Sequence, residues 1–188
     1  MTQYAVPDSD YDAGNWYSSV GEDLFADVDE VPADDSDYIS VTDDWTGSSE
    51  IAVLLLSNVT KPAVTSGHRI VFRASENSGM LVITLEVTLK SGSVVVATFS
   101  EEASLSATLT EYSHDIDSGD VASYLSSQSD YDNLSIEITA TDYMAAGTET
   151  TISQVHLELP DGATGFDRVS YDSSRSPARS AARAATKR

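Results

Sequence analysis

The chain has 188 residues, and its 31 acidic side chains against 10 basic ones give a formal net charge of −21. It contains no cysteine, which excludes disulfides, thiolate zinc sites and a cysteine nucleophile. The longest apolar run, residues 51–56, is too short to span a membrane, and the first residues do not read as a secretion signal.

The charge is distributed unevenly along the chain. Residues 1–50 hold 14 acids and no base, whereas the five charged residues from Ser173 onward are all basic. We therefore divide the chain into an acidic N-terminal arm (1–36), a β-sandwich domain (37–160) and a basic tail rich in Ser, Ala and Arg (161–188). The acidic surface repels a phosphate backbone, so nucleic-acid binding is not expected, except through the basic tail.

Taken in chain order, the hydrophobic pattern predicts mostly short strands. A short helix is expected within residues 21–30, and another within residues 117–125, where Asp117 is a suitable N-cap. Strands are predicted at residues 38–42, 51–56, 69–75, 80–90, 93–99, 105–111, 133–141 and 151–159. Seven or eight short strands bounded by turn residues indicate an all-β fold, a single antiparallel β-sandwich of the jelly-roll type.

The alternation of apolar and polar residues assigns faces to several of these strands. In residues 80–90, every second residue is apolar, which predicts one buried face. In residues 151–159 the same pattern places Gln154, His156 and Glu158 outward, and His156 is expected to be a solvated surface histidine. Residues 51–56 lack alternation, which favours a strand buried on both faces, with a turn of core helix as the alternative.

No motif indicates catalysis, a cofactor or a metal. His68, His114 and His156 lie on separate segments, and the sequence contains neither a GxSxG elbow nor a phosphate-binding loop. Residues 8–12 begin like a calcium loop but lack its glycine and its closing glutamate. A solvated acidic arm is favoured over a cation site there, and also at residues 34–37 and 115–120. We expect no catalytic residue, no metal and no cofactor.

Three sequence blocks carry a family resemblance. The first runs from Trp16 through LFADVDE at residues 24–30 to DDSDYI at residues 34–39, the second is HRIVFRA at residues 68–74, and the third is YDNLSIEIT at residues 131–139. Together they resemble a β-sandwich module of minor structural proteins in tailed bacteriophages. The basic tail after Pro160 departs from that pattern.

The resemblance implies a non-enzymatic virion protein that binds other virion proteins, such as capsid or tail subunits, in many copies. A capsid decoration or cement subunit is the preferred interpretation, with no membrane partner. The residues predicted to contact partners are Trp16, Arg175, Arg179, Arg183, Lys187 and Arg188. Arginine favours such contacts because its planar fork binds a carboxylate through two hydrogen bonds. For Trp16, anchoring the arm on the sandwich is an equally good interpretation.

The alternative is a carbohydrate-binding module on a tail or host-recognition appendage. It is suggested by the sandwich fold together with Trp16, Trp45 and nine tyrosines, because aromatic faces stack on sugars. Burial of these aromatic residues in the core would explain them equally well.

Overall fold

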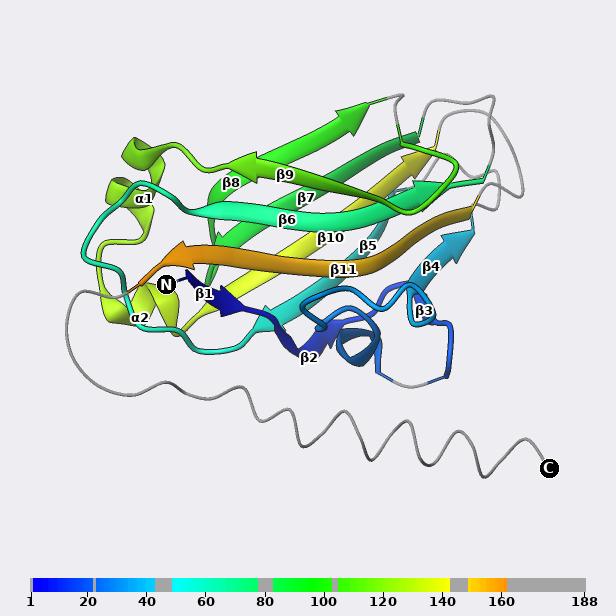
Figure 1. The fold of residues 1–188 in the computed structure, drawn as a ribbon, viewed down its shortest axis with the longest axis horizontal. Coiled ribbons are helices and arrows are strands. Elements are labelled where there is room, and N and C mark those ends of the chain that lie inside the picture. The colour runs from blue at the N-terminus through cyan, green and yellow to red at the C-terminus, as the bar shows by residue number, and fades with distance from the viewer. Residues whose placement is uncertain are drawn as a thin grey trace.

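The computed structural model describes residues 2–21, 23–42, 49–77, 83–102, 105–142 and 149–161. These residues form two antiparallel sheets packed face to face, an all-β sandwich (Figure 1). Sheet A has the order β3-β4-β11-β6-β9, and β1 also pairs with β11; its strands are β1 (Thr2–Ala5), β3 (Tyr17–Ser18), β4 (Ile39–Thr42), β6 (Arg69–Glu76), β9 (Thr110–Asp115) and β11 (Glu149–Pro160). Sheet B has the order β2-β5-β10-β7-β8; its strands are β2 (Pro7–Asp12), β5 (Ser49–Leu56), β7 (Ile83–Ser91), β8 (Val94–Glu102) and β10 (Leu134–Asp142).

The core lies between the sheets and is filled by the apolar positions of the alternating strands. Ile70 and Phe72 of β6 and Ile136 and Ile138 of β10 belong to the same core cluster, and all four are fully buried. Strand residues two apart share a face, so the polar positions between them lie on the outer faces. The prediction of an all-β antiparallel sandwich is confirmed.

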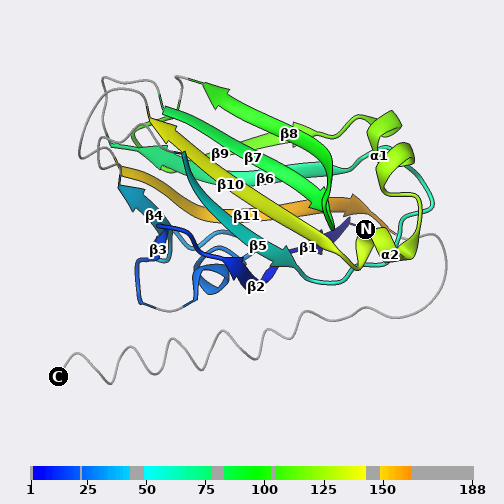
Figure 2. The same cartoon turned by 180° about the vertical axis from the view of Figure 1, so that it is seen from behind.

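Three short helices complete the described fold. They are η1 (Leu24–Asp27, a 3-10 turn), α1 (Ser118–Tyr124) and α2 (Gln128–Tyr131), of which α1 and α2 lie at one end of the sandwich (Figure 2). The predicted N-cap of α1 is confirmed, because the Asp117 carboxylate accepts a hydrogen bond from the Gly119 amide at 2.7 Å. Among the described residues, no helix has the length and apolar character needed to cross a membrane.

The first 36 residues do not form a separate arm. β1 pairs with β11 in sheet A, and β2 pairs with β5 in sheet B, so both are part of the sandwich. Edge strands carry unpaired backbone groups, and these two segments satisfy them, β2 despite its aspartates at residues 8, 10 and 12. Asp10, which was considered as part of a calcium-like loop, accepts hydrogen bonds from the backbone amides of Leu24 and Phe25, both at 2.8 Å.

Two strand predictions need correction. β5 is buried on one face only, because nothing in the described residues covers the outer face of sheet B there; Ile51 and Leu55 are 41% and 38% exposed. The strand expected at residues 105–111 begins at Thr110, and its inward residues are Tyr112 and His114, whose rings stack on Phe72. Apolar periodicity missed it because its inward positions are polar aromatic residues.

Candidate functional site

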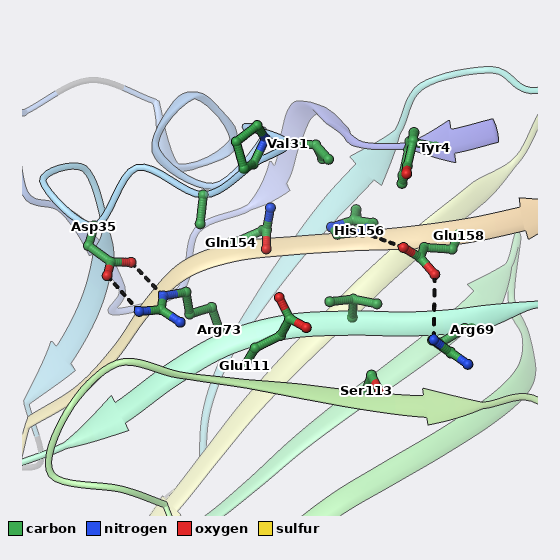
Figure 3. A pocket seen from close by; sticks show the side chains of 13 residues that line it. Tyr4, Val31, Asp35, Arg69, Arg73, Glu111, Ser113, Gln154, His156 and Glu158 are labelled. Atoms are coloured by element: carbon green, nitrogen blue, oxygen red, sulfur yellow. Dashed lines mark hydrogen bonds and ion pairs between the residues drawn. The ribbon is translucent and has the colours of Figure 1, made fainter. Parts of the chain in front are cut away.

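A hollow of about 390 Å³ lies on the outer face of sheet A (Figure 3). Its floor is crossed by three rows of side chains, because β11, β6 and β9 pair in register. From one end to the other, the rows are Gln154, Arg73 and Glu111; then His156, Val71 and Ser113; then Glu158 and Arg69, with Asp115 beside Arg69 but outside the lining of the hollow. The two arginines are four residues apart on β6, or about 13 Å at 3.3 Å per residue.

A β-bulge in β11 directs its polar side chains into this floor. The pairing with β6 shifts between Ile152 and Gln154, and Ser153 is the additional residue. As a result Ile152 and Val155 both lie in the core, whereas Gln154 and His156 lie on the outer face. A shift of one residue moves every side chain of a strand to the opposite face, so the bulge decides which residues line the hollow.

One wall of the hollow is the segment of residues 31–35, which is held by several polar contacts. Arg73 donates two hydrogen bonds to the Asp35 carboxylate, at 2.6 and 2.7 Å, and the Ser153 hydroxyl donates to the same carboxylate at 3.0 Å. The Gln154 amide donates to the Glu30 carbonyl at 2.5 Å. This wall is therefore fixed before any ligand arrives, which reduces the entropic cost of binding.

Tyr4 on β1, which pairs with Glu158, lines the hollow on the same side of β11 as Val31, nearer to Glu158 (Figure 3). Its ring meets the His156 ring edge to face, with 5.5 Å between centroids and an interplanar angle of 68°. Tyr4 is 43% exposed, so part of this residue is open to solvent. In the third row, Arg69 forms ion pairs with Asp115 at 2.8 Å and with Glu158 at 3.9 Å.

The hollow combines ionised groups with one neutral buried imidazole. The Arg73 guanidinium lowers the pKa of Asp35, so this carboxyl stays ionised. Burial lowers the pKa of His156 from 6.5 to about 4, so its ring is neutral near pH 7. Neither ring nitrogen of His156 has a hydrogen-bond partner, and a Glu158 carboxylate oxygen lies 3.8 Å from Nε2.

His156 was expected on the surface, and this expectation is wrong. The side chain does point outward from sheet A, as alternation predicts, but it is only 3% exposed. Tyr4 packs against it, and residues 31–33 line the same hollow. Both covering segments belong to the region that was expected to be a separate arm, so the sequence pattern around His156 contained no sign of them.

The predicted partner-binding residues fall into two groups. Arg175, Arg179, Arg183, Lys187 and Arg188 lie outside the described residues, as does Trp45, and their roles stay predictions. Trp16 is 4% exposed, and its indole Nε1 donates to the Glu50 carbonyl at 3.3 Å. This burial agrees with the anchoring interpretation, and a contact between the Trp16 region and a partner remains a prediction.

An acidic cluster lies in the loop before β4. Carboxylate oxygens of Glu30, Asp34 and Asp37 lie within 4.8 Å of one another, and Asp37 is buried. At residues 34–37 the sequence favours a solvated acidic segment over a cation site. Clusters of this kind are common on acidic surfaces, so the spacing by itself does not define a metal site.

Comparison with known proteins finds no matching family model and no matching curated protein. Solved structures to which this chain is structurally similar include TmCBM61 in complex with β-1,4-galactotriose (TM-score 0.39, 12% identity, covering 83% of this chain and 86% of that one). They also include a family 29 carbohydrate-binding module from Piromyces equi (TM-score 0.41, 11% identity, 88% and 96%). A third is the enzymatically active domain of tailspike protein 4 from bacteriophage CBA120 (TM-score 0.42, 10% identity, 84% and 19%).

Proposed function

We propose that this protein is a non-catalytic carbohydrate-binding module whose binding site is the hollow on the outer face of sheet A. The observation that carries the proposal is the three-row floor, in which guanidinium, carboxylate, amide, imidazole and hydroxyl groups from three strands converge on one concave surface. Concave sites with a few convergent polar groups on rigid elements are the usual form of small-ligand sites.

The polar groups of the hollow suit a ligand rich in hydroxyl groups. Each sugar hydroxyl both donates and accepts, and the floor offers donors (Arg69 and Arg73) beside acceptors (Glu111 and Glu158). Between the two arginine rows lies Val71, a largely buried apolar side chain that lines the hollow. Tyr4 supplies an aromatic face at the rim.

The charge of the hollow favours a neutral carbohydrate over an acidic one. Its lining contains the carboxylates Asp35, Glu111 and Glu158 and the guanidinium groups Arg69 and Arg73, which leaves one net negative charge. Both guanidinium groups are already paired with carboxylates, so neither is available as an unpaired partner for a uronate. The body of the protein, with 28 acids and 4 bases over residues 1–159, adds a further repulsive field.

The acidic residues of the hollow are better placed for binding than for glycosidic bond cleavage. A glycoside hydrolase needs one carboxyl with a raised pKa as general acid. Asp35 has its pKa lowered by Arg73, and Glu158 forms an ion pair with Arg69. These observations support the non-catalytic part of the proposal.

The test is a titration of the full-length protein with neutral oligosaccharides (xylohexaose, cellohexaose and β-1,4-galactotriose) and with tri-galacturonate, followed by calorimetry. We expect binding to at least one neutral oligosaccharide and none to tri-galacturonate. Arg73→Gln should weaken binding about tenfold, which corresponds to the loss of one charge-assisted hydrogen bond. The matched control is Lys90→Gln, which breaks the Lys90–Glu137 ion pair on the outer face of sheet B and should leave affinity unchanged. A glycan array on which the protein binds nothing would overturn the proposal.

A subunit that contacts other virion proteins is the second candidate. The observation that favours it is the exposed apolar pair Ile51 and Leu55 on the outer face of β5, on the sheet opposite the hollow. Val53, which is partly exposed, lies between them on the same face, and a contiguous exposed apolar patch often marks a protein contact surface. Placement on a phage particle, whether on the capsid or on a host-recognition appendage, rests on the sequence resemblance. Mass spectrometry of purified particles with copy counting tests it: many copies support a decoration subunit, a few support an appendage, and absence refutes both.

A further inference from the structure

His156 is a buried histidine whose hydrogen-bonding capacity is unused. Its two ring nitrogens are out of contact with solvent and have no hydrogen-bond partner, although the ring lines the hollow. A neutral imidazole has one N–H donor and one nitrogen acceptor. Burying both groups inside a protein without hydrogen-bond partners costs free energy. Most buried polar groups are satisfied, so an orphaned pair beneath a concave surface calls for an explanation.

The surroundings of His156 identify where a partner can enter. Figure 3 shows His156 between Gln154 and Glu158 on β11, with Val31 and Tyr4 on the same side of the sheet. Residues 31–35 are fixed by the Asp35–Arg73 pair, whereas Tyr4 is 43% exposed, and its side chain makes no hydrogen bond within the described residues and contacts the His156 ring edge to face. Tyr4 is therefore the covering group that can turn aside.

We infer that His156 is a specificity-determining residue of the hollow, and that a hydroxyl group of the bound carbohydrate enters beside Tyr4 and hydrogen-bonds to its imidazole ring. This inference rests on the proposed function and adds a deep subsite to it. A hydroxyl matches the neutral ring because it can accept from the N–H or donate to the bare nitrogen. Once displaced, the Tyr4 ring is positioned to cover the apolar face of the same sugar unit.

The subsite also selects against ligands that lack the hydroxyl. A site built to hydrogen-bond a hydroxyl group rejects the analogue without it, because its own polar atoms then stay unpaired. Glu158, whose Oε1 lies 3.8 Å from Nε2 of His156, lines the same subsite and adds an acceptor that disfavours anionic substituents at this position.

The experiment compares the wild-type protein with His156→Phe, which keeps an aromatic ring of similar shape and removes both nitrogens. The probe is whichever of xylohexaose, cellohexaose and β-1,4-galactotriose binds the wild type most tightly. We expect His156→Phe to bind it at least about tenfold more weakly, the equivalent of one hydrogen bond, and to melt no lower than the wild type. The matched control is His114→Phe, a histidine on the inner side of sheet A between Phe72 and Phe99, which should leave affinity unchanged.

A second measurement does not depend on the variant folding. In the wild-type protein, the ¹⁵N resonances of the His156 ring should shift when the same oligosaccharide is added, because hydrogen bonding changes the shielding of both nitrogens. Unchanged resonances at saturation, or full affinity in a folded His156→Phe protein, would overturn this inference and leave the proposed function standing. If no oligosaccharide binds the wild type at all, the proposed function fails, and the subsite fails with it.

Discussion

The buried imidazole of His156 should make the protein lose stability between pH 7 and pH 5. Burial lowers the pKa of this group from 6.5 to about 4. At pH 5 the ring is therefore neutral in the folded protein, whereas in the unfolded chain it is protonated. The unfolded state binds the additional proton, so the free energy of unfolding falls as the pH drops from 6.5 toward 4.

The size of the effect follows from the same two pKa values. One unit of pKa difference is equivalent to about 1.4 kcal/mol, and integration over the two titration curves gives a loss of about 2 kcal/mol between pH 7 and pH 5. By pH 4 the loss is about 3 kcal/mol. Such a loss is a large fraction of the stability of a typical domain.

The assay is urea unfolding of the wild type and of His156→Phe at pH 7 and at pH 5. Urea is used because it carries no charge and leaves electrostatic interactions unscreened. The groups that surround His156 and also carry charge or titrate (Tyr4, Glu158, Glu111, Arg69 and Arg73) are the same in both proteins. The wild type should lose about 2 kcal/mol more than the variant over this interval. An equal loss in both proteins would refute the assignment of a neutral, buried His156.

Further predictions concern the backbone, the net charge and the tail. Gly14 has φ +52°, and a Cβ there would lie 2.0 Å from the Ile51 carbonyl oxygen, whereas Gly92 has φ +56° and open space around it. In urea unfolding, Gly92→Ala should lower the free energy of unfolding by about 1–2 kcal/mol, because alanine is strained in left-handed backbone, and Gly14→Ala should lower it clearly more. Equal losses would contradict the close approach of a Cβ at position 14 to the Ile51 carbonyl oxygen. The melting temperature should rise between low salt and about 0.5 M NaCl, because salt screens the excess acidic charge, and a flat or falling curve would mean that the acids are already paired. Deletion of residues 173–188 should leave the melting transition unchanged, since Ser, Ala and Arg bury little apolar surface, and a lowered transition in calorimetry would show that the tail stabilises the domain.

The local sequence pattern was sufficient to predict the parts of the fold that depend on residues close together in the chain. Strict alternation in β10 identified its buried face, and the Asp117 cap identified the start of α1, because both signals act within a few residues along the chain. The same alternation placed Gln154, His156 and Glu158 on the outer face of β11, and the structure agrees.

Tertiary structure decided the candidate site. The hollow exists because β11, β6 and β9 are neighbours in register, and pairing between strands that are distant in the sequence leaves no local signal in any of them. The acidic composition of residues 1–36 indicated a solvated arm, yet hydrogen bonding to the sheet edges placed β1 beside β11. That placement packs Tyr4 against His156 and turns an outward-facing histidine into a buried one. Residue type and alternation determine which face a side chain takes, whereas only the packing of distant segments determines what covers it.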